Sequence, residues 1–366
     1  MNTPTAGFPN VPVVYPGQFP ANFNPNTAGW GNFAPEVIEE SKGKLLMLDL
    51  DFGRKCSLNC PHCFRKSSSW REGAEQDLSP SEIRGIIWQA KELGLRSVKI
   101  LGAGEPFENE GFVDFLYFLD DEEIDVTVFT AGHAIEPWLA HGLAQIERLS
   151  LIVKFNTSNP FGQACMVGDG FEYPMKRNYT IQLLAEAGMN KSNPTRLGLG
   201  TSPIMKANVQ EAFDMYEWAM RRNMFAVICP TMCSGRCGND SWMGINPDAD
   251  QLVELYAHIY RFNIEYGIQT LDQIKEEGIS AYAGARPCNQ VGNGLYVTLD
   301  GIVRQCPGND VDNLGDVRQT SLRQIWENSP NFSRSGKFNY GCPAKDGRSI
   351  PTGLYQKVLA NIEIGS

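Results

Sequence analysis

The sequence predicts an α/β protein: a partial (β/α)6, TIM-like barrel followed by a small C-terminal domain. Two observations lead to this fold class. Short apolar segments alternate with segments that carry helix start and stop signals, and this alternation is repeated six times. After about residue 285 the pattern changes to two short strand-like segments around an Asp-Gly turn, and then to one short helical segment. Six β/α units make about three quarters of an eightfold barrel.

The elements follow from local sequence signals. The clearest helix start is Ser79, a good N-cap that is followed by Pro80 and, three residues after the cap, by Glu82. The predicted helices are 79–93, 111–119, 137–146, 174–187, 209–222 and 248–266. The predicted strands are 45–52, 97–101, 126–130, 149–155, 197–201 and 225–230. Chemistry in parallel β/α proteins gathers at the carboxyl ends of the strands, so the loops that follow them should hold the site.

The domain organisation follows from changes in composition. The N-terminal residues are rich in Pro, Asn, Gly and Ala and have no helical or strand period, which predicts an extended or partly disordered arm. In the last domain, 294–306 is predicted to be a hairpin and 321–328 a short helix. The predicted boundaries are 1–43 for the arm, 44–245 for the barrel, 246–284 for linking helices and 285–366 for the small domain.

Composition excludes several classes of partner. The formal net charge of −10 argues against nucleic acid, which requires a clustered positive surface. No segment approaches the roughly 18 uninterrupted apolar residues that would span a membrane. The N-terminus lacks the basic and apolar regions of a secretory signal. We therefore expect a cytoplasmic protein, in which the ten cysteines serve metal or redox chemistry rather than disulfide bonds.

Three cysteines directly follow the first predicted strand. Cys56, Cys60 and Cys63 have the spacing C-x3-C-x2-C. Three thiolates on one loop can hold three irons of a [4Fe–4S] cluster and leave the fourth iron open to a substrate or cofactor. The alternatives are buried thiols or a zinc knot. Zinc sites usually combine two cysteine pairs, and His62, between two of these thiols, would be a strained fourth ligand.

This motif, with the aromatic Phe64 after its last cysteine, resembles that of the radical S-adenosylmethionine (SAM) superfamily. The resemblance covers about residues 44–240. It implies that the open iron chelates the amino and carboxyl groups of SAM, and that one electron then cleaves SAM to methionine and a 5′-deoxyadenosyl radical. It also implies an external reductant, flavodoxin or ferredoxin.

Further residues resemble the SAM-binding elements of this family. Gly102-Ala103-Gly104-Glu105-Pro106 is similar to the family's Gly-Gly-Glu-Pro element, with Ala103 in place of its first glycine. Glycines let a ligand approach the backbone, and Glu105 offers an acceptor to the SAM ammonium. The polar residues that end the fourth and fifth strands are further candidates, although each could be a structural turn residue. The SAM contacts that the resemblance implies are Phe64, Gly104, Glu105, Asn156, Ser158 and Thr201.

The C-terminal cysteines indicate a second cluster. Cys288, Gly301 and Cys306 form the pattern C-x12-G-x4-C, which resembles the start of the auxiliary-cluster domains called SPASM and, in a shorter version, twitch. A full SPASM domain continues with about four closely spaced cysteines and a distant last one, whereas only Cys342 follows here. The shorter type, with one auxiliary [4Fe–4S] cluster, fits better. Cys237 is our candidate for its fourth ligand; otherwise one iron is open and could bind substrate.

Cys229, Cys233 and Cys237 follow the sixth strand, at the end where the site is expected. Their C-x3-C-x3-C spacing could hold a separate cluster. Alternatively, Cys233 or Cys229 could donate a hydrogen atom to a substrate radical, and Cys233 is our candidate catalytic residue. Cys229, on its apolar strand, could equally be a buried thiol. His133 follows the third strand and could contact the substrate.

The resemblance leaves three functions open. The main prediction is a radical SAM oxidoreductase or epimerase that abstracts a hydrogen atom from a small polar natural product, such as an aminocyclitol or sugar. The second is modification of a ribosomally made peptide, with activation of a partner protein as a variant; the first 40 residues are short for the leader-binding segment that such enzymes often carry. The third is a non-catalytic electron carrier, which the open iron of the first motif disfavours.

Overall fold

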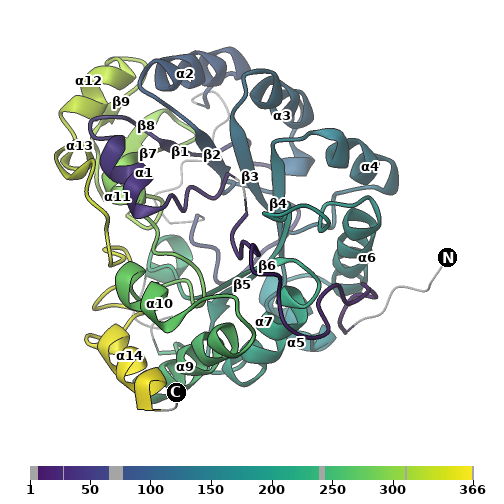
Figure 1. Ribbon diagram of the computed structural model, residues 1–366. Coiled ribbons are helices and arrows are strands. Elements are labelled where there is room, and N and C mark those ends of the chain that lie inside the picture. The colour runs from purple at the N-terminus through teal and green to yellow at the C-terminus, as the bar shows by residue number, and fades with distance from the viewer. Residues whose placement is uncertain (1–6, 28, 66–76, 239–243, 310, 365–366) are drawn as a thin grey trace.

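The computed structural model describes residues 7–27, 29–65, 77–238, 244–309 and 311–364, and all structural statements concern these residues. A nine-stranded sheet with the order β6-β5-β4-β3-β2-β1-β7-β8-β9 forms the centre of the molecule (Figure 1). The strands from β6 to β7 are parallel, and β8 and β9 are added antiparallel. The predicted α/β class with a partial barrel and a C-terminal hairpin is confirmed.

The strands are β1 (Met47–Leu50), β2 (Ser97–Ile100), β3 (Asp125–Thr130), β4 (Leu149–Lys154), β5 (Leu197–Ile204), β6 (Phe225–Pro230), β7 (Gly294–Val297), β8 (Ile302–Arg304) and β9 (Gly315–Asp316). The helices around the barrel are α2 (Pro80–Glu92), α3 (Phe112–Asp121), α4 (Pro137–Gln145), α5 (Pro160–Val167), α6 (Glu172–Glu186) and α7 (Ala212–Met220). The remaining helices are α1 (Pro35–Glu40), α9 (Ala249–Glu265), α10 (Leu271–Glu277), α11 (Gln290–Asn293), α12 (Leu322–Glu327), α13 (Pro330–Arg334) and α14 (Leu354–Ile364).

Local signals account for most of these elements. The capping box at the start of α2 forms as predicted: the Ser79 side chain accepts from the Glu82 backbone N–H, and the Glu82 side chain accepts in return. Helix α5 is absent from the prediction, although Asn159 caps it and Pro160 occupies its first position. Its eight residues follow the fourth strand directly and carry no clear amphipathic period, so only these two capping signals could have identified it.

The C-terminal hairpin is part of the barrel sheet. Strand β7 pairs in parallel with β1, from Met47 opposite Gly294 to Leu50 opposite Val297. The hairpin partner β8 returns beside β7, with Arg304 opposite Tyr296. This region is predicted to be a small separate domain because no local sequence signal indicates a strand partner about 250 residues away. The pairing places the start of β7, and with it the cysteine-bearing segments, beside the amino end of β1.

The N-terminal arm closes the same end of the barrel. Residues 7–27 and 29–34 form no helix or strand, yet Trp30 is only 3% exposed. Its ring packs against Phe129, Phe225 and Tyr282, with centroids 5.4, 5.1 and 5.5 Å away. In Figure 1 the purple arm runs from beside α6, in front of the strands, to α1. The arm is therefore part of the core, which its polar, proline-rich composition does not predict.

Successive side chains along the strands alternate between the core beneath the helices and the interior of the barrel. Leu48, Leu50 and their neighbours on β2 and β3 pack against the helices in the main core. The residues between them, such as Asp49 and Lys99, point into the barrel. No helix in the described part of the chain is long and apolar enough to cross a membrane.

Replacing Trp30 by alanine should therefore destabilise the whole barrel. Removing a buried tryptophan from a core of aromatic rings costs about 3–5 kcal/mol of unfolding free energy. Denaturant unfolding followed by circular dichroism would measure this loss. Trp138→Ala is the matched control, because Trp138 is 75% exposed and its removal should change stability by less than about 0.5 kcal/mol. Equal effects of the two variants would contradict the packed arm.

Candidate functional site

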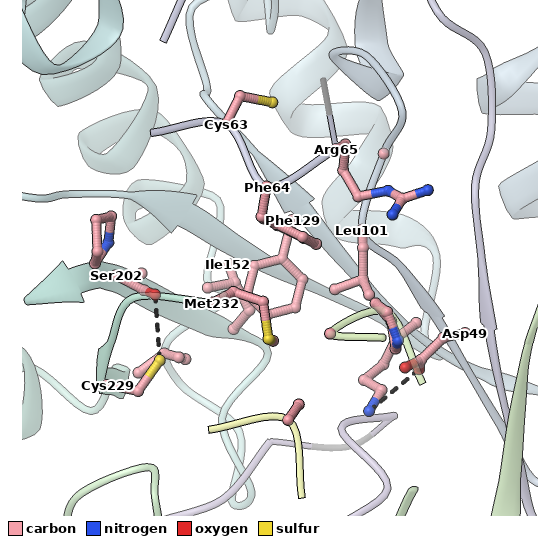
Figure 2. Close-up of a pocket in the computed structure, with 18 of the residues that line it drawn as sticks. Asp49, Cys63, Phe64, Arg65, Leu101, Phe129, Ile152, Ser202, Cys229 and Met232 are labelled. Atoms are coloured by element: carbon pink, nitrogen blue, oxygen red, sulfur yellow. Dashed lines mark hydrogen bonds and ion pairs between the residues drawn. The ribbon is translucent and has the colours of Figure 1, made fainter. Parts of the chain in front are cut away.

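A cavity of about 250 Å³ runs through the barrel interior and is lined by both predicted cysteine groups. Cys56, Cys60 and Cys63 line one part of it, and Cys288, Cys306 and Cys342 line another. Figure 2 shows Cys63 on one side of this cavity, Asp49 and Cys229 on the other, and Phe129, Ile152 and Met232 between them. The first group follows the carboxyl end of β1, whereas Cys288 and Cys306 flank the amino end of β7. The site thus extends along the barrel instead of occupying the carboxyl end alone.

The loop that carries the first cysteine group is fixed by polar contacts. The Ser57 backbone N–H and hydroxyl donate to the Glu108 carboxylate at 2.9 and 2.7 Å. His133 Nε2 lies 2.9 Å from both the Ser57 hydroxyl and Glu108 Oε1. Arg236 donates to the Cys60 carbonyl oxygen at 2.9 Å. His133, predicted as a possible substrate contact, instead supports this loop and is not among the residues that line the cavity.

The glycine-rich segment after β2 packs directly on this loop. The Gly104 N–H donates to Gly53 and the Glu105 N–H to Lys55, at 3.1 and 2.9 Å. A Cβ atom on Gly104 would lie 2.2 Å from the Lys55 carbonyl oxygen, so no other residue fits without moving the backbone. Both Gly104 and Glu105 line the cavity, as does Phe64.

Glu105 is anchored to the third strand. Its carboxylate accepts from the Thr130 hydroxyl at 2.5 Å and from the Ala131 N–H at 2.7 Å. Burial raises the pKa of Glu105, and these two hydrogen bonds act in the opposite direction. The carboxylate is therefore held in place, and its remaining acceptor positions are the ones available to a ligand ammonium.

The other predicted SAM contacts do not reach the cavity. Asn156 donates to the Ser202 carbonyl oxygen at 2.8 Å, Ser158 to Glu211 at 2.7 Å and Thr201 to the Phe155 carbonyl oxygen at 2.9 Å. None of the three is among the lining residues. Lys154 and Ser202, from the same two strands, line the cavity instead. Thr201 and Ser202 are neighbours on β5, and neighbouring side chains along a strand point to opposite faces.

The chemistry of the donors fits two iron–sulfur clusters. Lys154 Nζ lies 3.6 Å from Cys60 Sγ. Burial, with a smaller contribution from the charge of Cys288, raises the pKa of Cys306 and Cys342 to about 12. Such thiols become thiolates when they bind metal. No three ligating side chains among the described residues stand close enough to hold a single metal ion, but in a [4Fe–4S] cube each cysteine ligates a different iron.

The cysteines after β6 are divided between the two groups. The Cys237 thiol donates to the His62 carbonyl oxygen at 3.0 Å, beside the first loop. Burial raises the pKa of Cys237 to about 12, and the neighbouring charges of Cys63 and Cys233 add to this. Cys233 is buried and does not line the cavity, whereas Cys229 does. The predicted fourth ligand, Cys237, thus lies beside the loop of the first cysteine group although it also lines the cavity, and the predicted catalytic Cys233 is not among the lining residues.

A buried ion pair inside the barrel was not predicted from the sequence. Lys99 Nζ lies 3.2 Å from Asp49 Oδ1, and both residues line the cavity. Burial raises the pKa of Asp49 to about 6, against the effect of Lys99. Asp49 and Lys99 could have been identified as charged residues in otherwise apolar strand segments, because a buried charge needs a partner or a function.

Gly104→Ala should disrupt the loop that carries Cys56, Cys60 and Cys63. The added Cβ overlaps backbone atoms of residues 54 and 55, which costs about 1–3 kcal/mol and displaces the loop. Iron per chain after anaerobic reconstitution, together with thermal unfolding, would reveal this. Gly85→Ala is the control, since nothing lies within 4 Å of its Cβ position and alanine favours the helix. Full iron content in Gly104→Ala would refute the close packing.

Comparisons with known proteins agree with this geometry. The model of the radical SAM superfamily matches residues 50–198, and that of SPASM, an iron–sulfur cluster-binding domain, matches residues 288–348. The mycofactocin maturase MftC of Mycobacterium tuberculosis is 26% identical over 227 residues, which are 61% of this chain and 54% of that protein. A probable GTP 3′,8-cyclase of Thermococcus kodakarensis is 26% identical over 176 residues, 48% of this chain and 53% of that protein. The chain spans about half the length of these curated relatives.

Solved structures show the same fold. Streptococcus suis SuiB, in a crystal structure bound to its precursor peptide SuiA, superposes with a TM-score of 0.60 at 15% identity, covering 88% of this chain and 78% of SuiB. The two matched domains imply a SAM-binding [4Fe–4S] cluster, SAM and an auxiliary cluster. The chain thus contains a radical SAM domain and a C-terminal SPASM iron–sulfur cluster-binding domain.

Proposed function

We propose that this enzyme abstracts a hydrogen atom from an amino-acid side chain of a peptide and oxidises that side chain. The observation that carries the proposal is the apolar character of the cavity between the two cysteine groups. Its walls there are formed mainly by large apolar and aromatic side chains: Trp30, Leu101, Phe129, Ile152, Val227 and Met232. Such walls suit an aliphatic or aromatic side chain inserted from a peptide.

The same walls argue against the sugar-like substrate that the sequence analysis favours. A cyclitol or sugar presents hydroxyl groups around its whole ring. Each hydroxyl that loses water without gaining a partner costs about 1–3 kcal/mol. Phe129 and Ile152 offer no hydrogen-bonding groups to such a ring. The peptide alternative therefore becomes the main proposal.

The relatives support the peptide proposal. Proteins named as mycofactocin maturases are similar to this chain over 61% of its length. SuiB, whose crystal structure holds the precursor peptide SuiA, shares the fold of this chain at 15% identity, which supports a peptide substrate.

Named residues have distinct roles in the proposal. Cys56, Cys60 and Cys63 would hold the SAM-binding cluster, while Gly104 and Glu105 would contact SAM. When bound, this cluster and SAM supply the carbon radical that takes the hydrogen atom. The C-terminal cysteines Cys288, Cys306 and Cys342 would hold the auxiliary cluster, which supplies an electron acceptor.

Oxidation fits better than epimerisation because of where the candidate hydrogen donor lies. An epimerase must return a hydrogen atom to the substrate radical. Cys233 is not among the residues that line the cavity, and Cys229, the other candidate donor, lines it but would be unable to donate if it ligates the auxiliary cluster. The external reductant, flavodoxin or ferredoxin, remains a prediction.

A small polar substrate is the second candidate. The buried Lys99–Asp49 pair offers charge to a ligand. Trp30 Nε1 and Gln290 Oε1 are buried, have no hydrogen-bond partner among the described residues, and belong to residues that line the cavity. The relatives named GTP 3′,8-cyclases, one of which is 26% identical over 48% of this chain, also favour it.

Transfer of deuterium into 5′-deoxyadenosine would distinguish the two candidates. Extracts of cells that carry this gene, grown in deuterated medium, would be separated by size and incubated anaerobically with the reconstituted enzyme, SAM and dithionite. We expect the peptide fraction to give deuterated 5′-deoxyadenosine, and exhaustive protease digestion to abolish the transfer. Deuterium that comes from the small-metabolite fraction would overturn the peptide proposal.

Iron content should report the two clusters separately. We expect about eight irons per wild-type chain after reconstitution, and about four in the Cys56→Ala/Cys60→Ala/Cys63→Ala variant. That variant should form no 5′-deoxyadenosine. A count of about four in the wild type that falls to none would remove the auxiliary cluster, and with it the electron acceptor of the proposed oxidation.

A further inference from the structure

We infer that Cys229 is the fourth protein ligand of the auxiliary cluster, a role that the sequence analysis gives to Cys237. The inference rests on the proposed assignment of Cys288, Cys306 and Cys342 to that cluster. It follows from the hydrogen bonds and side-chain contacts between the carboxyl end of β6 and the three segments that carry these cysteines.

Cys229 lies at the end of β6 and shares the cavity with the C-terminal cysteines. It is 3% exposed, and it lines the same cavity as Cys288, Cys306 and Cys342. Cys237 lines this cavity too, so the contacts of the neighbouring backbone must distinguish the two candidates. The backbone beside it is tied to the segment that leads to Cys288, because the Ala283 N–H donates to the Ile228 carbonyl oxygen at 2.9 Å.

The segment of Cys342 is tied to the same strand end. The Lys345 N–H donates to the Cys342 carbonyl oxygen at 2.8 Å. The Lys345 ammonium donates to the carbonyl oxygen of Pro230, the residue after Cys229, also at 2.8 Å. Lys345 is fully buried, so this contact is shielded from water. One lysine therefore connects the Cys342 turn to the Cys229 strand.

The segment that follows Cys306 contacts the segments that follow Cys229 and Cys342. A Cβ atom on Gly308 would lie 2.5 Å from Met232 Sδ and 2.5 Å from Ala344 Cβ. These residues follow Cys306, Cys229 and Cys342 by two or three positions. The three loops thus converge at a contact that only glycine permits.

Tyr282 lies where these segments meet. The Lys345 ammonium is 6.0 Å from the centroid of its ring, and the next residue, Ala283, is hydrogen-bonded to Ile228. Cys237, in contrast, donates to the carbonyl oxygen of His62, which lies between Cys60 and Cys63. The two candidates therefore belong to different cysteine groups.

The surroundings of Cys229 suit a thiolate ligand. Its sulfur lies 3.2 Å from the Ser202 hydroxyl (Figure 2). On metal binding the Cys229 thiol releases its proton, and the Ser202 hydroxyl can then donate to the sulfur. Hydrogen bonds to ligand sulfurs are among the factors that set the reduction potential of a cluster. A ligated Cys229 is also unable to donate a hydrogen atom to a substrate radical.

The test uses the chain in which Cys56, Cys60 and Cys63 are replaced by alanine, so that only the auxiliary cluster contributes. Cys229→Ala, Cys233→Ala and Cys237→Ala are added to it one at a time. Each protein is reconstituted anaerobically with iron and sulfide, analysed for iron, then oxidised and examined by electron paramagnetic resonance (EPR). We expect about four irons and no three-iron signal in the background chain and in the Cys233 and Cys237 variants. The Cys229 variant should lose about one iron on oxidation and give the signal of a three-iron cluster.

Several outcomes would overturn the inference. A Cys229 variant that behaves like its background, or a three-iron signal in the Cys237 variant, would assign the fourth position elsewhere. A background chain without iron would remove the auxiliary cluster itself, while deuterium transfer by the wild type would still test the proposed reaction independently. If Cys229→Ala fails to fold, Ser202→Ala decides: an unchanged reduction potential of the auxiliary cluster overturns the inference, and a shifted potential supports it.

Discussion

A buried carboxylate, Asp51, joins the two halves of the site. It follows β1 and is fully buried. Its Oδ2 atom accepts from Arg65 at 2.8 Å and from the Tyr296 hydroxyl at 2.6 Å, and the Arg65 guanidinium lies 4.8 Å above the Tyr296 ring. Arg65 follows Cys63 by two residues, and Tyr296 lies in β7. Removing one member of a buried ion pair costs about 3–5 kcal/mol, so the first cysteine loop and the β1–β7 pairing depend on each other.

That pairing explains why one cavity serves both cysteine groups. The chain enters the first loop at the carboxyl end of β1 and enters β7 at the opposite end of the same pair of strands. Side chains that point inward from the parallel strands then form the wall between the two groups. The arm closes the amino end through Trp30, which packs against Phe129 on β3 and Phe225 on β6.

Sequence alone could predict what local signals encode. The helix start at Ser79 and the three-cysteine loop were identified from neighbouring residues. The β1–β7 pairing and the packing of Trp30 were not, because both depend on contacts between distant segments. Thr201 was selected for its polarity, and its side chain does not line the cavity, whereas that of Ser202 does. The register between β5 and β6 shifts after Thr201, and polarity alone does not tell which face a side chain takes. Linear spacing likewise could not separate Cys229 from Cys237.

The lysines in the barrel give an independent argument for anionic ligands in the cavity. The chain carries a net charge of −10, yet Lys99 and Lys345 are buried beside the auxiliary cysteines, and Lys154 lies beside Cys60. The charge of Lys99 lowers the pKa of Cys306 and that of Lys345 lowers the pKa of Cys342, each against the larger effect of burial. A buried ammonium is costly unless it is compensated, and Asp49 compensates Lys99. Thiolate-ligated clusters would supply further negative charge, which makes buried cations at these positions favourable.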